Sequence, residues 1–270
     1  MRVSVSALAW PGSTDPAVSP DFAGLLARHG VGQIDIVPTK IWPDWRFRAT
    51  DVQGLRTRLA GAGMSTPGMQ SIFFKRVGLN VFADAAQWRR TRLHLDRIAL
   101  LAHRLGIRAV AFGAPANRDP QGMEPGAAWR LALRRLRAVA PLFAARGTTL
   151  CLEPVPAGAF LRDHDETARF VREANVEGLA MVLDTAALHA TVADPARAVA
   201  RFLDVVRHVH ASEPDLGPFA TPAVDHAAIA WALRRQVYDG TVALEMVARD
   251  DAVANLDTAL GTVTRVYGGA

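Results

Sequence analysis

The sequence alternates between short apolar segments and longer amphipathic segments along its whole length, and this alternation most constrains its fold. The apolar segments are rich in Val, Ile, Leu and aromatic residues and end at Gly, Pro or polar residues, as strands do. Eight strands are expected, at residues 3–8, 33–37, 64–74 (broken), 107–112, 148–152, 179–183, 205–209 and 241–244. Eight strand–helix units in 270 residues match the size of a single (β/α)8 TIM barrel, an α/β fold.

The segments between the strands carry helix signals. Helices are expected at residues 20–29, 51–60, 83–105, 127–146, 165–174, 195–203, 226–236 and 252–266. Gly30, Gly106 and Gly147 follow three of them, where a C-cap glycine is common. No linker rich in Gly, Ser or charge interrupts the chain, so residues 1–270 are expected to form one domain.

An open, doubly wound sheet is the main alternative to the barrel. That fold usually has a Gly-rich phosphate loop after its first strand. Here the first strand is followed by Trp10-Pro-Gly-Ser-Thr, which lacks the G-x-G-x-x-G pattern. The sequence therefore favours the barrel.

Composition excludes several classes of protein. The single cysteine, Cys151, rules out a disulfide framework and indicates a reducing compartment. No segment has the length of a signal peptide or a membrane span, so a cytoplasmic protein without a membrane partner is expected. The formal net charge is +5, but the arginine clusters at residues 89–92 and 130–137 fall in helical segments. These clusters indicate solvated helix faces, and no nucleic-acid partner is expected.

Four of the expected strands end on a residue that can bind a metal ion. Glu153 follows Leu150-Cys-Leu, Asp184 follows Ala180-Met-Val-Leu, and Glu245 follows Val242-Ala-Leu. His210 follows Val205-Val-Arg-His-Val in the same way. The carboxyl ends of barrel strands meet at one mouth, so the four side chains are expected to converge there. Three carboxylates and one imidazole suit a single Mn²⁺ or Mg²⁺ ion and can also take Co²⁺ or Zn²⁺. Any one of these acids could instead pair with an arginine, but four at successive strand ends favour a metal site.

Three motifs extend this pattern to a known family. They are Ala111-Phe-Gly-Ala-Pro-Ala-Asn-Arg, His208-Val-His-Ala-Ser-Glu-Pro and Leu244-Glu-Met. With the four strand ends, they resemble the xylose isomerase-like TIM-barrel superfamily, in its sugar phosphate isomerase/epimerase branch (AP endonuclease family 2-like). The resemblance covers nearly the whole chain. It implies that Glu153, Asp184, His210 and Glu245 are the metal ligands, and that Glu153 and Glu245 are the catalytic proton carriers.

The resemblance implies a metal-dependent isomerase or epimerase of a sugar or related polyol. A metal ion stabilises the enediolate that forms when a proton leaves the carbon beside a carbonyl. Two glutamates on opposite faces can then remove and return a proton, which epimerises the centre, whereas one face alone gives isomerisation. Loss of a β-hydroxyl would make the protein a dehydratase of an inosose or keto acid, and the sequence leaves this choice open. An apurinic endonuclease and a non-catalytic sugar-binding barrel are less favoured alternatives.

Several other residues are expected to contact the substrate at the barrel mouth. Lys40 and Arg118 lie in loops after the second and fourth strands and could bind a carboxylate or phosphate. Gln70, near the end of the third strand, could bind a hydroxyl group. Glu213 is expected to pair with a loop arginine or to orient His210 through its second nitrogen.

Two positions depart from the ketose epimerases. Those enzymes have a histidine three residues after the metal-binding Asp, where this chain has Ala187 and a possible replacement in His189. They also have an arginine six residues after the metal-binding His, where this chain has Leu216. A small carbohydrate is the expected partner, although these departures argue against an ordinary ketohexose, and the resemblance is compatible with a homodimer.

Overall fold

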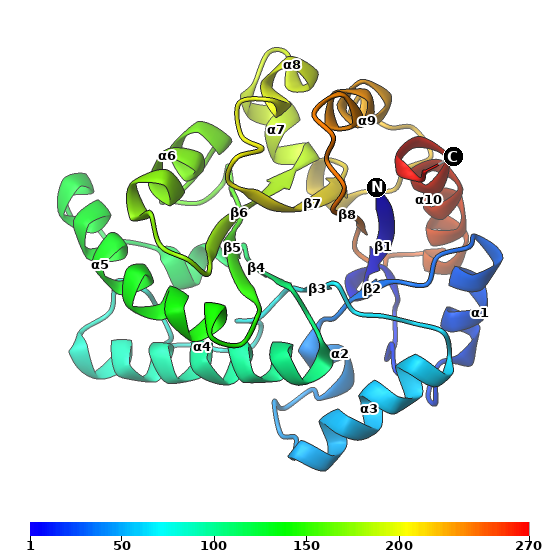
Figure 1. Ribbon diagram of the computed structural model, residues 1–270, viewed down its shortest axis with the longest axis horizontal. Coiled ribbons are helices and arrows are strands. Elements are labelled where there is room, and N and C mark those ends of the chain that lie inside the picture. Colours follow the sequence, from blue (N-terminus) through cyan, green and yellow to red (C-terminus); the bar gives the residue numbers. More distant parts are fainter. Residues whose placement is uncertain (270) are drawn as a thin grey trace.

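A computed structural model describes residues 1–269 as eight parallel strands ringed by helices (Figure 1). The strands are β1 (Arg2–Ser6), β2 (Ile34–Asp35), β3 (Gly68–Met69), β4 (Ala109–Phe112), β5 (Thr149–Leu152), β6 (Leu179–Asp184), β7 (Val206–Ser212) and β8 (Thr241–Glu245). The predicted (β/α)8 TIM barrel is therefore confirmed.

The hydrogen-bonded strand order is β2-β1-β8-β7-β6-β5-β4-β3, with every pair parallel. β2 and β3 stand at the two ends of this order, and single bridges join Gln33 to Ser65 and Ile36 to Met69. The backbone N–H of Ile36 donates to Gly68, and that of Gln70 donates to Ile36, both at 2.9 Å. These bonds close the sheet into a barrel.

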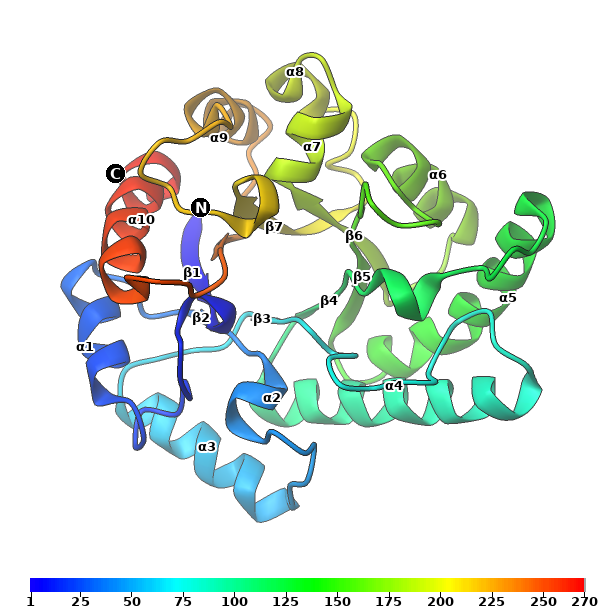
Figure 2. The same cartoon turned by 180° about the vertical axis from the view of Figure 1, so that it is seen from behind.

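The outer layer consists of α-helices, which lie outside the strands in both views (Figures 1 and 2). They are α1 (Pro20–Arg28), α2 (Pro38–Ile41), α3 (Ala49–Gly61), α4 (Ala85–Leu105), α5 (Pro125–Ala144), α6 (His164–Ala174), α7 (Thr185–Thr191), α8 (Pro195–Val199), α9 (His226–Arg235) and α10 (Ala252–Tyr267). Short 3-10 helices are η1 (Ala7–Ala9), η2 (Pro115–Arg118) and η3 (Pro214–Leu216). No helix among residues 1–269 is both long and apolar enough to cross a membrane.

The longest helix shows how local sequence fixes an element. Asp84 accepts hydrogen bonds from the backbone N–H groups of Ala86 and Gln87 and so caps the start of α4. Gly106 ends the helix in a left-handed conformation with φ of 77°, which glycine adopts without steric cost. Both ends lie within two residues of the expected boundaries.

The third strand and the segment after β6 differ from expectation. Only Gly68–Met69 of the expected strand at 64–74 pairs as β3, because Ser71 and Lys75 adopt positive φ angles of 55° and 59° and turn the chain away. After β6 the chain forms α7, which was not predicted, and α8 is shorter than the helix expected at 195–203.

Alternate residues of the strands pack in two separate apolar clusters. Val110, Leu150 and Met181 belong to the large core that the strands share with the helices. Their neighbours Ala111, Cys151 and Val182 form a small second cluster, which places them on the opposite, inward face. Glu153, Asp184 and His210 continue the inward rows, so the strand register delivers them to the mouth of the barrel.

Candidate metal centre

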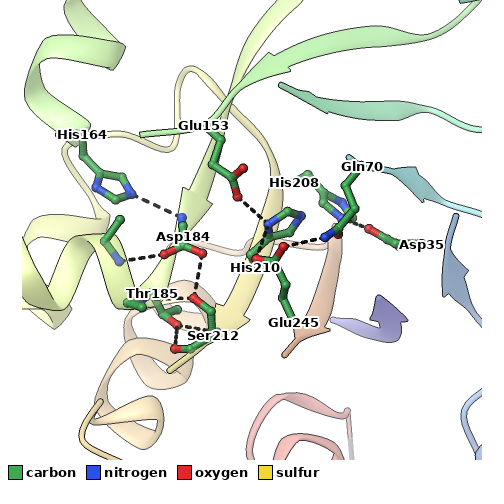
Figure 3. A network of polar contacts seen from close by, with 12 residues as sticks. Asp35, Gln70, Glu153, His164, Asp184, Thr185, His208, His210, Ser212 and Glu245 are labelled. Atoms are coloured by element: carbon green, nitrogen blue, oxygen red, sulfur yellow. Dashed lines mark hydrogen bonds and ion pairs between the residues drawn. The ribbon is translucent and has the colours of Figure 1, made fainter. Parts of the chain in front are cut away.

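Four side chains at the carboxyl ends of β5 to β8 form one cluster. They belong to Glu153, Asp184, His210 and Glu245, and one ligand atom of each lies within 4.8 Å of the others. Figure 3 shows the carboxylates grouped around the His210 ring. The structure thus brings together the four residues expected to bind a metal ion, each from the end of a different strand.

His210 stands at the centre of the cluster. Its Nδ1 lies 2.7 Å from Oε1 of Glu153 and 3.0 Å from Oε2 of Glu245. Burial alone would lower the pKa of His210, but the charges of Glu245 and Glu153 raise it well above its usual value. The two distances show that Nδ1 is the ring nitrogen that faces the carboxylates.

The cluster concentrates negative charge in a buried place. The Asp184 and Glu245 residues are only 7% and 6% exposed. Burial, together with the charges of Glu153 and Glu245, raises the pKa of Asp184 to about 7. Buried carboxylates that repel one another in this way are stabilised by a cation, and three carboxylates with one imidazole fit a divalent metal ion.

Asp184 is held rigidly by its neighbours. Its Oδ1 accepts a hydrogen bond from the backbone N–H of Ala187 at 2.7 Å, so it caps the start of α7. Its Oδ2 accepts a hydrogen bond from the Ser212 hydroxyl, also at 2.7 Å. His164 accepts from the backbone N–H of Asp184 at 3.3 Å. These hydrogen bonds fix the orientation of the carboxylate. Each oxygen keeps a further lone pair, so Asp184 is suited to anchoring an ion.

Gln70 reaches the cluster from the end of β3. Its amide nitrogen donates to Oε1 of Glu245 at 2.5 Å (Figure 3). Its buried carbonyl oxygen has no protein partner among residues 1–269. Gln70 therefore lies where it was expected, and its free acceptor is available to a bound hydroxyl group.

A cavity of about 400 Å³ opens beside Glu153 and Glu245. Its walls are residues 70–75 after β3 and residues 113–117 after β4, with Leu8 and Leu216. A volume of this size fits a small molecule. Leu216 lines the cavity, so the position that departs from the ketose epimerases does face the site.

Arg118 is buried and contacts the main chain of Glu153. It is 2% exposed, and its Nη2 donates to the main-chain oxygen of Glu153 at 2.8 Å. Its guanidinium packs 5.5 Å from the Phe112 ring, and burial lowers its pKa to about 10. It does not line the cavity, in contrast to the expected position at the mouth. Arg118 instead supports the backbone that carries Glu153.

The remaining predicted contacts also lie apart from the cluster. Lys40 donates to the main-chain oxygen of Trp10 at 2.6 Å, and burial lowers its pKa. Glu213 accepts hydrogen bonds from the backbone N–H of Ala223 at 2.8 Å and from His226 at 2.9 Å, so it pairs neither with His210 nor with a loop arginine. His189 is exposed on α7.

Sequence reasoning overlooked Ser212, His164 and a buried pair formed by Asp35 and His208. The sequence did carry a signal for Ser212 and His208. Positions 208, 210 and 212 alternate along β7, and a period of two places all three side chains on the inward face. His164 and Asp35 carry no comparable local pattern.

The fold and the cluster define a (β/α)8-barrel protein with its candidate site at the carboxyl ends of the strands. The chain belongs to the xylose isomerase-like TIM barrel family, whose sequence profile matches residues 23–265. No curated protein sequence matches the chain significantly.

Solved structures share the fold over the full chain. D-psicose 3-epimerase from Clostridium cellulolyticum H10, solved with D-tagatose, has a TM-score of 0.84 and 14% identity, covering 100% of both chains. An L-ribulose 3-epimerase has a TM-score of 0.82 and 20% identity, covering 98% of this chain and 94% of its own. An IOLI protein with a bound zinc atom has a TM-score of 0.78 and 14% identity, covering 99% and 98%.

Proposed function

We propose that this protein is a divalent-metal-dependent enzyme that isomerises or epimerises a sugar or related polyol. The observation that carries the proposal is the placement of two carboxylates. Glu153 and Glu245 come from β5 and β8, contact the same nitrogen of His210, and both line the cavity. Two bases beside one small-molecule cavity suit proton transfer at a substrate carbon.

The proposed reaction moves a proton on a carbon next to a carbonyl group. One glutamate carboxylate accepts this proton as the C–H electron pair forms the enediolate. The other glutamate returns a proton to the opposite face for epimerisation, whereas return on the same face to the neighbouring carbon gives isomerisation. A divalent ion, when bound, supplies positive charge that stabilises the developing oxyanion.

The neighbouring residues support this division of roles. Asp184 does not line the cavity that Glu153 and Glu245 line, and hydrogen bonds fix both of its oxygens, so we assign it the role of an anchor and not of a base. Gln70 fixes one oxygen of Glu245 and directs the other towards His210. Arg118 holds the main chain at Glu153. These contacts keep the two proton carriers in place while a substrate binds.

The ligand set supports a single ion, with Mn²⁺ or Mg²⁺ preferred and Co²⁺ or Zn²⁺ acceptable. The structure of the IOLI protein contains zinc, which supports a metal in this fold. The proposed partner is a small carbohydrate. We also propose a cytoplasmic location for the protein, because its one cysteine, Cys151, is free and buried, as is common in a reducing compartment.

Two measurements test the proposal. Elemental analysis should find about one divalent ion per chain, as expected for one four-residue cluster. Incubation in D₂O with keto-sugars, inososes and sugar acids should place deuterium next to the carbonyl group of the substrate, seen by NMR. Protein that contains no metal and does not bind Mn²⁺ in calorimetry would refute the metal centre. Release of water from the substrate would identify a dehydratase instead.

A further inference from the structure

A buried, hydrogen-bonded pair of side chains lies inside the barrel, beneath the metal centre. His208 Nε2 and Asp35 Oδ2 are 2.5 Å apart, and their side chains are only 3% and 1% exposed. The Ser4 hydroxyl donates to the other Asp35 oxygen at 2.7 Å. The hydrogen bond between two buried polar side chains does little more than offset the cost of burying them, so their presence here calls for another role.

The barrel makes room for this pair. A side chain at Gly68 would overlap the Asp35 carboxylate, so only glycine fits opposite it on β3. His208 stands two residues before His210 on β7, and both side chains point inward (Figure 3). The two imidazole rings meet edge to face, with centroids 5.4 Å apart and planes at 85°. His208 therefore supports the ring that stands at the centre of the cluster.

The two nitrogens of His210 have different surroundings. Nδ1 faces Glu153 and Glu245, and is the nitrogen available to an ion in the cluster. Nε2 is buried and has no hydrogen-bond partner among residues 1–269. A neutral imidazole that binds a metal through one nitrogen carries its proton on the other. A negative charge close to the ring stabilises that proton.

Asp35 provides such a charge. One ligand atom each of Asp35, His208 and His210 lie within 4.8 Å of one another. Among residues 1–269, no other carboxylate belongs to this group, whereas Glu153, Asp184 and Glu245 gather in the metal cluster. Metal-binding histidines generally depend on groups behind them to fix their orientation and strengthen them as ligands.

We infer that Asp35 and His208 are positioning residues that orient the His210 ring and stabilise the tautomer that binds the metal ion. This inference rests on the metal centre proposed above. His208 acts by packing against the ring, and Asp35 acts by holding His208 and by its charge. The pair influences the reaction only through His210, since it lies below the cavity and does not line it.

Metal binding by the folded protein tests the inference. Asp35→Asn removes the charge at nearly constant shape, His208→Gln removes the supporting ring, and Ser4→Ala removes one hydrogen bond to Asp35. The matched control is Cys151→Ala, because Cys151 is buried on the inward face two residues before Glu153, as His208 is before His210. Circular dichroism verifies that each variant is folded before its affinity is measured.

Asp35→Asn and His208→Gln should each weaken Mn²⁺ binding in calorimetry by about 10- to 100-fold, the usual effect of losing a group behind a ligand. Ser4→Ala should weaken it less, and Cys151→Ala should not weaken it. The visible spectrum of the Co²⁺-loaded protein should change in the first two variants, since the ligand field of His210 changes.

Other outcomes separate the possible failures. Wild-type affinity and an unchanged Co²⁺ spectrum in both Asp35→Asn and His208→Gln would overturn the inference and leave the metal centre intact. If either variant does not fold, Ser4→Ala with wild-type affinity would overturn it. Two ions per wild-type chain, with one lost in His208→Gln, would show that the pair binds metal itself. A wild type that binds no metal would refute the proposed function and the inference with it.

Discussion

Gly113 and Glu153 face each other so closely that any side chain at position 113 would overlap the Glu153 carboxylate. They follow β4 and β5, which pair in register with Phe112 opposite Leu152. The missing side chain leaves the space in which the Glu153 carboxylate reaches His210. A glycine outside the cluster thus determines the position of one of its four members.

Replacing Gly113 with alanine should therefore damage the site more than the fold. In Gly113→Ala the Glu153 carboxylate must move, so we expect Mn²⁺ affinity to fall by about tenfold or more, as when the surroundings of a ligand are altered. Calorimetry measures this effect. Gly24→Ala in α1 is the control, because that position has free space and alanine favours a helix. Equal metal affinity in Gly113→Ala and wild type would contradict the assignment of Glu153.

Replacement of either proposed proton carrier with glutamine should abolish turnover. Glu153→Gln and Glu245→Gln keep the shape of the side chain but cannot accept a proton, so activity should fall by about 10²- to 10⁴-fold. The assay needs saturating Mn²⁺, because each variant also loses a ligand charge. A variant that still exchanges the substrate proton with D₂O without completing turnover retains the glutamate that removes it. Full activity in either variant would refute the two-base mechanism.

Ser212 should be required for tight metal binding. Its hydroxyl fixes Oδ2 of Asp184, so Ser212→Ala frees that carboxylate and should weaken Mn²⁺ binding by about tenfold. Thr264→Ala removes a hydroxyl from α10, where it bonds to the backbone of Leu260 far from the cluster, and should bind Mn²⁺ normally. Comparable affinities in the two variants would show that Asp184 does not need this support.

His94 should make the protein less stable in mild acid. Burial lowers its pKa from 6.5 to about 4, and its Nε2 lies 2.7 Å from the Ile72 oxygen. The folded state therefore favours neutral His94, and its contribution to stability is complete above pH 6.5. As the pH falls from 6.5 towards 4, the unfolded chain binds a proton that the folded chain does not. Stability should then fall by at most about 1.4 kcal/mol per pH unit.

Thermal unfolding of wild type and His94→Gln at pH 7 and pH 5 measures this contribution. The loss of melting temperature between the two pH values should be smaller in the variant, because glutamine does not titrate. His103→Gln is the control, since His103 is exposed on the same helix. An equal pH dependence in wild type and His94→Gln would show that His94 is not responsible.

Sequence patterns predicted the barrel and the four residues of the cluster, because both predictions depend on local signals. Strand periodicity and strand-end polarity are visible within a few residues of Glu153 or Asp184. The environment of Arg118 was not visible, since its partner is a main-chain oxygen 35 residues away. Asp35 and His208 are 173 residues apart and meet only when the barrel closes. The partner of Glu213 likewise depends on how the loop at residues 214–225 folds back.

Two members of the cluster, Glu153 and Glu245, line the cavity, but most of its wall comes from other parts of the chain. Residues 153–245 supply the four clustered side chains, whereas residues 70–75 and 113–117 supply most of the wall. Apart from the Gln70 hydrogen bond to Glu245 and the close approach of Gly113 to Glu153, no hydrogen bond or ion pair within residues 1–269 joins these two segments to the four clustered side chains. Under the proposed function, directed evolution of the wall should therefore exchange one substrate for another while the four clustered residues stay unchanged. Substrate specificity and chemistry would then be separately heritable traits within one barrel.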